Sequence, residues 1–514
     1  MADFDPFTAT ISDIQEAYSS GSLTAVSVVE AYLSQIEAQN DYLHAIIALP
    51  PKSLLLKQAH ELDEERKKSG PRSPLHGIPV VVKDNIATHP DLGVPETTAG
   101  SYALIGSRVW KSAPAVEKAS QLVKAGAIVL GKGNLSEFAW FKGNGLPSGW
   151  SALGGQTQSP YVKGGVDPND SFSGHSNPGG SSSGSAVSVA AGLSTVAIGT
   201  ETDGSIIFPG TRAALYCLKP TIPIISQEGV IPISHLSDSI GPMARSPRDV
   251  AYMLDAMVDP LKTRVPKGGY STFLQGHWKG IRVGALNVEP WLLSSFVVKP
   301  VESATRQMIH DIDAAYAKLA ELLGDSFHKE IDLVSPKEVG EDKNGVDHFG
   351  KLTYNDFGPL LDHYLQGLEV SPVRSLKELI EWNAAHAGEE LPEDHPQQDR
   401  LIKASNITAM TTEEYDVSLS YIRRMSREEG IDKALSKYNI DVIIGPGDSF
   451  MSTLASAAGY PIATIPLTHL EFNGRPFGIC VMATAHGEGQ ILKFMSAWEA
   501  TFPKRDVPLL KGNL

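Results

Sequence analysis

The sequence predicts an α/β protein: one large domain in which helices cover both faces of a mixed, mostly parallel β-sheet. Two observations carry this prediction. Short apolar runs, such as residues 80–82, 127–130 and 442–444, have the composition of buried strands, and segments with helical periodicity separate them. Strands that alternate with helices favour parallel pairing, because the helix provides the crossover. Hydrophobic residues make up 42% of the 514 residues, enough for a large core.

The N-terminal half holds most of the predicted elements. Residues 1–70 show helical periodicity, with a break at Gly21. Residues 141–178 are rich in Gly, Ser, Asn and Pro without periodicity, and a loop of this length in a compact domain is usually functional. Within residues 71–298, strands are expected at 80–82, 127–130, 195–199, 213–218 and 280–286, and helices at 116–126 and 186–193.

The C-terminal half first leaves the predicted sheet and then returns to it. Residues 299–440 carry charged helical patterns, notably at 301–323 and 414–438, which are typical of a peripheral layer. The last part, residues 441–514, is expected to contain buried strands at 441–446 and 462–466, a turn at 474–478 and a final helix at 489–501. We therefore treat residues 1–514 as one domain of four parts: N-terminal helices (1–70), a core (71–298), a peripheral helical region (299–440) and a return to the core sheet (441–514).

The composition argues against a nucleic-acid-binding or membrane protein. Net charge is −15, from 44 basic and 59 acidic residues, which disfavours a polyanion-binding surface. No run of about eighteen apolar residues occurs, and the N-terminus lacks the features of a signal peptide, so we expect a cytoplasmic protein without a membrane partner. The two cysteines, Cys217 and Cys480, are too few for a disulfide framework and read as core residues.

A serine-rich stretch, Gly179–Ser185, is the most informative part of the sequence. Such composition is typical of a flexible linker. This stretch, however, runs directly into the apolar helical segment 186–193, which the expected strand 195–199 and a second polar turn ending in Ser205 follow. Loop, buried helix, buried strand and loop in succession indicate a serine-based site rather than a tether.

Two other motif matches in this region fail on context. Residues 126–133 come close to the phosphate-binding pattern GxxxxGK[ST], but Gly133 replaces the metal-binding hydroxyl residue and an apolar strand replaces the loop. Residues 180–184 fit the GxSxG nucleophile elbow with Ser182 as nucleophile. That motif must follow a buried strand, whereas residues 174–178 are polar.

Five motifs in the expected order resemble the amidase signature family of serine hydrolases, and the resemblance covers nearly the whole chain. It implies the amidase signature fold and an amide hydrolase, with the catalytic core at 71–298. The segment Ser375–Pro392 is also similar to the branch of the family that includes peptide amidases. The motifs are Leu75–Asn85, Ala125–Glu137, Gly179–Ala186, Gly199–Ile206 and Gly474–Gly478.

The resemblance implies a Ser-cisSer-Lys triad. Ser205 matches the nucleophile and Lys83 the base, and Ser181, rather than Ser182 or Ser183, matches the bridging serine that follows a cis peptide bond, here Gly180–Ser181. A lysine can act as base when burial holds it neutral, and Ser181 can both accept and donate a proton. Asp84 need not pair with Lys83, because successive strand side chains point to opposite faces.

The same resemblance implies the rest of the machinery. Backbone N–H groups of Thr202, Asp203 and Gly204 would stabilise the oxyanion of an acyl-enzyme pathway, and Ser185 would support the site by hydrogen bonding. No metal and no cofactor is needed. His76 and His235 read as ordinary structural histidines.

The sequence departs from the family pattern near the nucleophile, and the substrate stays open. Ile207 stands where the family often has an arginine, with Arg212 further along, and Asp203 replaces a common glycine. We expect a small-molecule amide or short peptide-amide substrate, bound in a cleft lined by residues 141–178 and parts of 299–440, and a homodimer is a possible assembly. The alternative is an amidase-like glutaminase subunit of a transamidation complex that supplies ammonia to a partner.

Overall fold

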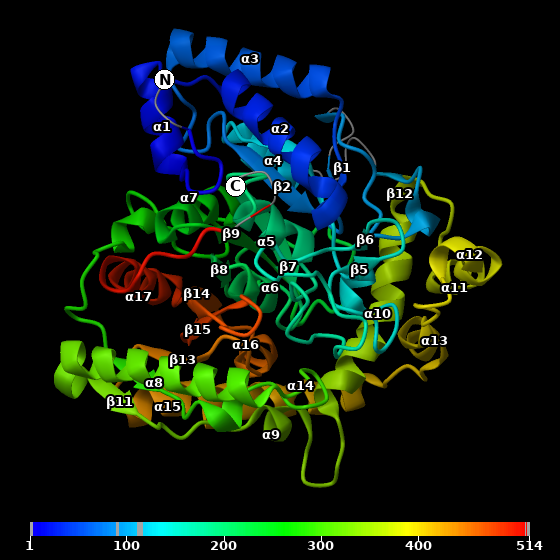
Figure 1. The fold of residues 1–514 in the computed structure, drawn as a ribbon. Coiled ribbons are helices and arrows are strands. Elements are labelled where there is room, and N and C mark those ends of the chain that lie inside the picture. Colours follow the sequence, from blue (N-terminus) through cyan, green and yellow to red (C-terminus); the bar gives the residue numbers. More distant parts are fainter. Residues whose placement is uncertain (1–3, 89–91, 110–116, 509, 511–514) are drawn as a thin grey trace.

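A computed structural model describes residues 4–88, 92–109, 117–508 and 510, and its centre is one eleven-stranded sheet (Figure 1). The sheet contains a strand at each of the expected positions, namely 80–82, 127–130, 195–199, 213–218, 280–286, 441–446 and 462–466. In their order across the sheet, the strands are β1 (Ile46–Ala48), β4 (Ile128–Gly133), β2 (Pro79–Lys83), β7 (Val196–Glu201), β9 (Ser239–Ala244), β8 (Tyr216–Lys219), β14 (Ile462–His469), β15 (Pro476–Met482), β13 (Val442–Pro446), β10 (Val283–Ala285) and β11 (Phe327–Lys329).

The sheet combines both kinds of pairing. β2 pairs in parallel with β4 and β7, and β10 pairs in parallel with β13 and β11. All ladders from β7 across to β13 are antiparallel, as is the ladder of β1 with β4. Parallel pairing therefore lies toward the two flanks and antiparallel pairing in the centre, where the turn after Leu470 joins β14 and β15 as a hairpin.

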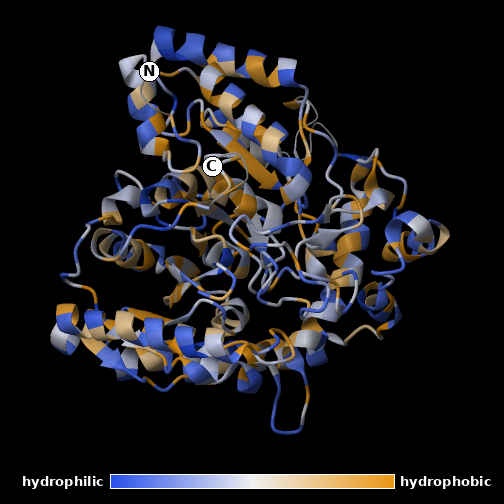
Figure 2. Cartoon of the chain, in the orientation of Figure 1, coloured by the Kyte–Doolittle hydropathy of each residue, from blue (hydrophilic) through white to orange (hydrophobic). Residues whose placement is uncertain are grey.

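Alternate residues of the central strands enter two different cores. In β13, Val442 and Ile444 belong to the largest apolar cluster, whereas Ile443 belongs to a second cluster. This alternation is the geometric consequence of the pleat and requires apolar helices on both faces. In Figure 2 the central strands carry mostly hydrophobic colours, while the outlying helices show both hydrophobic and hydrophilic residues. The prediction of one large domain with a mixed sheet covered on both faces is confirmed.

The covering helices form two layers. One layer contains α4 (Glu117–Lys124), α7 (Pro247–Met257), α17 (Glu488–Thr501) and α8 (Glu302–Leu323), and the opposite layer contains α5 (Ser183–Ala190), α6 (Ile207–Arg212) and α16 (Met451–Ala458). The N-terminal helices are α1 (Ile11–Ser20), α2 (Ala25–Leu43) and α3 (Lys52–Ser69).

Within residues 299–440, α8 covers the sheet and β11 is its edge strand. The rest of this segment packs beside the sheet and contributes to a third apolar cluster. Its helices are α9 (Pro336–Gly340), α10 (His348–Gln366), α11 (Leu376–Ala385), α12 (Ala387–Glu390), α13 (Asp399–Asn406), α14 (Thr412–Arg423) and α15 (Asp432–Lys437), with a π-helical segment at Arg424–Ile431. Two-stranded pairs join β12 (Leu368–Val370) to β3 (Arg108–Val109) and β5 (Trp150–Ser151) to β6 (Gly155–Gln156). Short 3-10 turns lie at Tyr102–Leu104, Glu137–Trp140, Tyr270–Phe273, Glu289–Trp291 and Gly324–Ser326.

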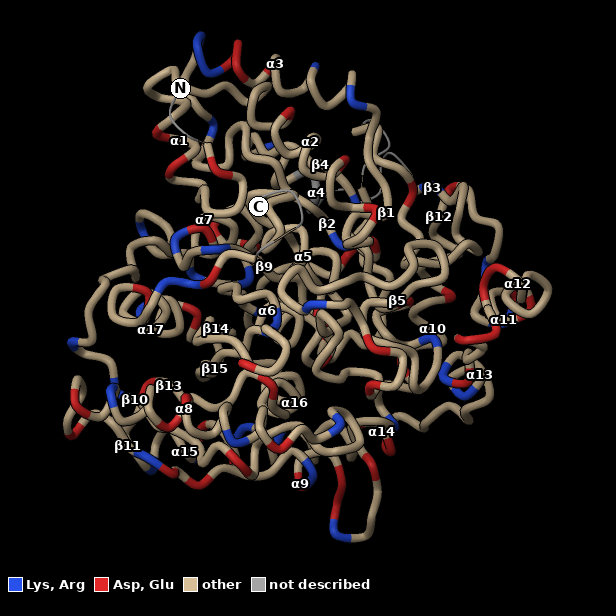
Figure 3. The backbone as a smooth tube through the Cα atoms, viewed as in Figure 1, with Lys and Arg blue, Asp and Glu red and all other residues tan. Residues whose placement is uncertain are grey.

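Charged residues are distributed over the outer elements. Figure 3 shows Lys and Arg interspersed with Asp and Glu, as expected for a chain without a basic binding face. No helix in the described ranges is both long and apolar enough to cross a membrane.

Candidate active site

Three structural elements bring the candidate catalytic residues together. β2 ends at Lys83, β7 leads into the turn before Ser205, and Ser181 directly precedes the first turn of α5. Because β2 and β7 are adjacent and parallel, their carboxyl ends meet at one edge, with Val82 opposite Ile198. α5 packs across both strands, and this places Ser181 over the same edge.

The Lys83 side chain is fully buried and points at Ser181. Its Nζ donates to Ser181 Oγ at 2.7 Å and to the Thr200 carbonyl at 3.1 Å. Burial lowers the pKa of Lys83 to about 7, although the charges of Glu201 and Asp238 act to raise it. No carboxylate forms an ion pair with Lys83 within the described part of the chain. A substantial fraction of this lysine is therefore neutral near pH 7.

The neighbouring carboxylate, Asp84, turns to the other face of the strand. It accepts hydrogen bonds from the Thr98 N–H and hydroxyl, and one oxygen lies 3.7 Å from the buried Lys132 Nζ. Burial lowers the pKa of Lys132 to about 8, and the charge of Asp84 opposes this shift. Asp84 thus lies near Lys132 instead of Lys83, and within the described residues Lys83 has no counter-ion.

Ser181 is held by backbone contacts in a buried position. The Gly180–Ser181 peptide bond is cis. The Ser181 carbonyl accepts from the Ser136 N–H at 3.1 Å, while its hydroxyl oxygen accepts from Lys83. A hydroxyl that accepts one bond retains its own proton for a second partner.

Ser205 lies in the same cavity as Ser181. Its side chain is 7% exposed, and its carbonyl accepts from the Ser182 N–H at 3.0 Å. Within the described ranges, the Ser205 hydroxyl makes no hydrogen bond. The structure thus joins Lys83 to Ser181 directly, and Ser205 lines the same cavity as Ser181 with its hydroxyl unengaged among the described residues.

The turn between β7 and Ser205 presents free backbone donors. No acceptor among the described residues receives the N–H groups of Thr202, Asp203 or Gly204. Gly204 has a φ of +78°, and a Cβ there would come within 2.3 Å of the Phe208 ring. Free N–H groups beside a candidate nucleophile are the donors that an oxyanion needs.

Side chains fix this turn from both sides. The Thr202 hydroxyl donates to Asp238 at 2.6 Å, and the Asp203 carboxylate accepts from Ser452 at 2.7 Å and Thr453 at 2.8 Å. Behind the turn, the buried Glu201 carboxylate accepts from the N–H groups of residues 206 and 207, at 2.7 and 2.9 Å. Asp203 therefore has a structural tie to α16 that the sequence did not reveal.

The other serines of the glycine-rich stretch bind the backbone. Ser182 donates to the Thr200 carbonyl at 3.0 Å, Ser183 to the Gly179 carbonyl at 2.5 Å and Ser185 to the Ile198 carbonyl at 2.9 Å. None of these three lines the cavity, so an elbow with Ser182 as nucleophile has no access to substrate. Ser185 ties α5 to β7, the strand that leads to Ser205.

The cavity has a volume of about 470 Å³ and is lined mainly by aromatic and small polar residues. Both expected segments contribute to it: residues from 141–178 and residues from 299–440. The lining residues are Ala139, Trp140, Phe141, Ser148, Phe172, Ser173, Gly180, Ser181, Thr202, Asp203, Ser205, Phe208, Ile233, Leu293, Ser294, Phe296, Val297, Phe349, Gly350, Thr353, Tyr354, Arg400, Phe450 and Thr453.

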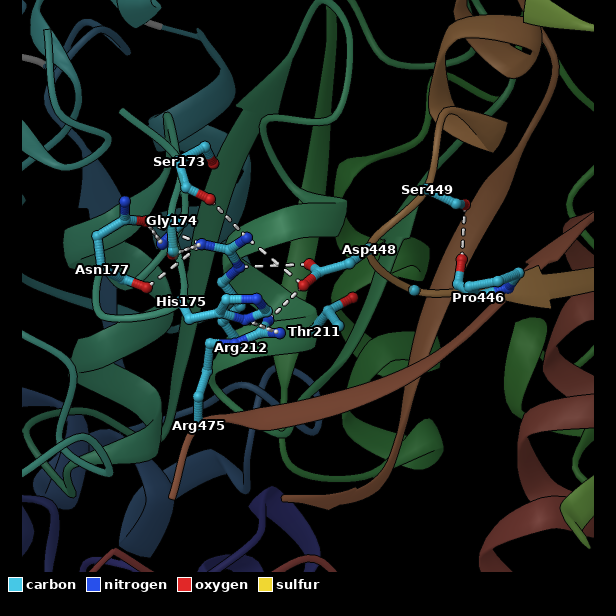
Figure 4. A network of polar contacts seen from close by, with 12 residues as sticks. Ser173, Gly174, His175, Asn177, Thr211, Arg212, Pro446, Asp448, Ser449 and Arg475 are labelled. Carbon is cyan, nitrogen blue, oxygen red and sulfur yellow. Dashed lines mark hydrogen bonds and ion pairs between the residues drawn. The ribbon is translucent and has the colours of Figure 1, made fainter. Parts of the chain in front are cut away.

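A buried charge network supports the cavity wall (Figure 4). The Arg212 guanidinium donates to the carbonyls of Ser173 at 2.9 Å and Gly174 at 2.7 Å, and it pairs with Asp448. Burial alone would raise the pKa of Asp448, but Arg212 and Arg475 hold it well below its ordinary range. Burial and the same two arginines lower the pKa of His175, which contacts Arg475, to about 3. Arg212 thus anchors the loop that carries cavity residues.

The histidines that could act as bases lie elsewhere. His76 is buried against the Leu62 carbonyl at 2.9 Å, and His235 lies 3.3 Å from Asp356. Neither lines the cavity. Within the described ranges, no three His, Cys, Asp or Glu side chains come close enough to hold a metal ion.

Comparisons with known proteins agree with this geometry. A family model described as Amidase matches residues 27–492. A protein of Arabidopsis thaliana named Probable amidase is 34% identical, over 96% of this chain and 89% of its own length. The native peptide amidase from Stenotrophomonas maltophilia has a TM-score of 0.83 at 34% identity, covering 98% of this chain and 99% of that structure.

A shorter match bears on the transamidation alternative. A glutamyl-tRNA(Gln) amidotransferase subunit of Chloroflexus aggregans is 34% identical, but over 61% of this chain and 60% of its own length.

Proposed function

The chain belongs to the amidase family and is an amide-hydrolysing enzyme, and from this premise we propose that it cleaves a carboxamide through a Ser205–Ser181–Lys83 triad. One observation carries the proposal. A fully buried lysine without a counter-ion donates to Ser181 at 2.7 Å, at the floor of a cavity that Ser205 also lines. In its neutral form this lysine is a base, and Ser181 is the only route by which it reaches the cavity in the described structure.

The proposed pathway begins with attack of Ser205 Oγ on the substrate carbonyl carbon. Its proton passes to Ser181 as the hydroxyl proton of Ser181 passes to neutral Lys83. The negative charge that develops on the carbonyl oxygen is stabilised by the N–H groups of Thr202, Asp203 and Gly204. Collapse then breaks the C–N bond, with the nitrogen protonated through Ser181, and leaves an acyl-enzyme on Ser205.

The ammonia or amine leaves at this stage, and the second half uses the same proton path. Water attacks the acyl carbon and gives a proton to Ser181 as Ser181 gives one to Lys83. Collapse then breaks the bond between the acyl carbon and Ser205 Oγ, the proton returns from Lys83 through Ser181 to Ser205, and the carboxylate product leaves. Phe208, Phe296 and the other rings of the cavity favour an apolar or aromatic acyl part. A small-molecule amide or a short peptide amide fits this chemistry, and the named peptide amidase supports the second.

The test is labelling and hydrolysis of the Ser205→Ala variant. We expect loss of fluorophosphonate labelling and a fall in amide hydrolysis of at least about a thousandfold, because only the nucleophile can form the covalent adduct. Ser436→Ala, an exposed serine on α15, serves as the matched control and should label normally. Labelling of Ser205→Ala at the wild-type rate would assign the nucleophile to another residue.

The glutaminase alternative has weaker support, because the relatives of that kind match only part of the chain. It predicts that glutamine is hydrolysed faster than peptide amides and aryl amides. A screen of these three classes with the isolated protein decides between the two functions.

A further inference from the structure

Arg400 is the cationic side chain of the cavity lining. Of the described residues that line it, only Asp203 and Arg400 have side chains that are charged near neutral pH. The two carboxylate oxygens of Asp203 are satisfied by the hydroxyls of Ser452 and Thr453. The Asp203 carboxylate is therefore already engaged by α16, and Arg400 is the charged side chain of the cavity lining that remains for a ligand.

Arg400 is held by rings rather than by a carboxylate. Its guanidinium carbon lies 4.5 Å from the ring centre of Phe141, 4.9 Å from that of Trp140 and 5.9 Å from that of Tyr354. One Nη1 hydrogen bond, at 3.1 Å, goes to the Trp140 carbonyl. The adjacent Asp399 carboxylate instead accepts from the N–H and side chain of Asn144.

The in-plane donors of Arg400 are largely unused. Its Nε is buried and has no acceptor, and among the described residues Arg400 forms no ion pair. Ring stacking occupies the faces of a guanidinium and leaves its edge available, and this edge matches a carboxylate through two parallel hydrogen bonds. The buried Nε itself is out of reach of a ligand, but Arg400 lines the cavity and, among the described residues, its Nη2 has no acceptor, so a ligand carboxylate would meet the Nη end of the guanidinium.

Resting on the proposed function, we propose that Arg400 binds a carboxylate that the substrate carries in addition to its scissile amide. The substrate class is then an amide with an apolar or aromatic body and a second, anionic end. The apolar rings of the cavity contact the body, Ser205 attacks the amide and Arg400 selects the charge. A cationic substrate end at this position is disfavoured, because no described carboxylate in the cavity is free to receive it.

The test compares phenylalaninamides that share one scissile amide and differ in charge at the amino end. The N-succinyl and N-glutaryl compounds carry a carboxylate at two lengths, the N-acetyl compound is neutral and the free amine is cationic. For wild-type protein, we expect kcat/KM for the better anionic compound to exceed that for the acetyl compound by about ten- to a hundredfold, the range of a charge-assisted hydrogen bond.

The matched variants are Arg400→Met and Lys403→Met. Lys403 lies on the same helix, with its Nζ 4.0 Å from the Tyr354 ring centre, but it does not line the cavity. Arg400→Met should bring the ratio of anionic to acetyl substrate close to one, while Lys403→Met should retain the wild-type ratio. An equal loss on all the compounds in Arg400→Met would show that the arginine only supports its rings, and would overturn the proposal, as would a wild-type ratio near one.

A binding measurement distinguishes failure of the proposed function from failure of the carboxylate proposal. If wild-type protein hydrolyses none of the compounds, the charge preference is measured by calorimetric titration with the same compounds. Tighter binding of an anionic compound to wild type, lost in Arg400→Met, supports the carboxylate site even then. Equal binding of anionic and acetyl compounds overturns it.

Discussion

Lys83 shows how burial favours the neutral form of a lysine side chain. Desolvation disfavours its ammonium form, and the neighbouring Asp84 bonds to Thr98 and lies near Lys132 instead of restoring that charge. The hydrogen bond to Ser181 then directs the lysine toward the cavity. Among the described residues, Asp84 thus accompanies Lys132, and Lys83 is left without a counter-ion.

The pH dependence of kcat/KM should reflect the ionisation of Lys83. Because only neutral Lys83 accepts a proton, kcat/KM should reach a plateau above an apparent pKa near 7 and fall about tenfold per pH unit below it. The measurement is a profile between pH 5 and 9 on a neutral amide, with stability checked at each pH. Lys83→Met should abolish most turnover and remain folded. Constant activity down to pH 5 would contradict the assignment of Lys83 as the base.

Residue-level prediction from sequence depended on contiguous motifs. Lys83, Ser181 and Ser205 each lie in a recognisable stretch, and the structure places the first two in contact and the third in the same cavity. Arg400 has no such stretch around it. Its partners Phe141 and Tyr354 are distant in sequence, so only the folded chain shows that they enclose it.

At the level of elements, α6 is the link between the sheet and the cavity wall. Arg212, at its last residue, reaches the loop carbonyls of Ser173 and Gly174 and the carboxylate of Asp448 after β13. Removing the guanidinium would leave buried acceptors without donors and reduce the charge compensation of Asp448. Buried ion pairs are costly to break on one side only.

Arg212→Met should therefore destabilise the protein by about 3 kcal/mol or more. Denaturant unfolding, followed by tryptophan fluorescence, measures the loss. Arg306→Met removes an arginine whose ion pair with Glu302 is exposed on α8, and should change the free energy of unfolding by less than about 1 kcal/mol. Similar values for the two variants would contradict the anchoring role of Arg212.

A strand could be predicted from the sequence where its residues form an uninterrupted apolar run. Runs such as Val80–Val82 and Val442–Ile444 are recognisable in the sequence because every residue is apolar, and all of them are buried in the structure. β9 (Ser239–Ala244) was not, because Ser239, Gly241 and Pro242 interrupt the apolar pattern although the strand is buried. Without β9 the sequence could not reveal the antiparallel centre of the sheet.

For the whole molecule, a buried charge cluster ties the peripheral region to the core. Lys142 Nζ lies 2.7 Å from Glu137 and 3.6 Å from Glu390 of α12, and all three side chains are fully buried. Ser101 also donates to Glu390. Burial raises the pKa of Glu137 well above its ordinary value; Lys142 opposes this shift and Glu390 adds to it. Two carboxyl groups thus share one buried lysine, and this crowding favours the protonated form of Glu137.

This cluster makes stability depend on pH in a defined direction. A carboxyl whose folded pKa is raised contributes stability at low pH, which is lost as pH rises through the folded pKa. Glu137→Gln, a neutral substitute of the same shape, should weaken the decline in thermal stability as pH rises from the ordinary glutamate pKa of 4.5 to pH 9. Melting temperatures of both proteins across this range measure it. An identical decline in the variant would show that the proton resides elsewhere.

The order of strands in the sheet has a consequence for biosynthesis. β13, β14 and β15 come from the last part of the chain, yet they lie between β8 and β10, which are made much earlier. Before residues 442–482 are synthesised, β8 and β10 lack the three strands that join them, so six strands on one side and two on the other would be left apart. Unpaired strand edges are sites of intermolecular pairing. We therefore expect the nascent chain to be most prone to such pairing just before these last strands emerge.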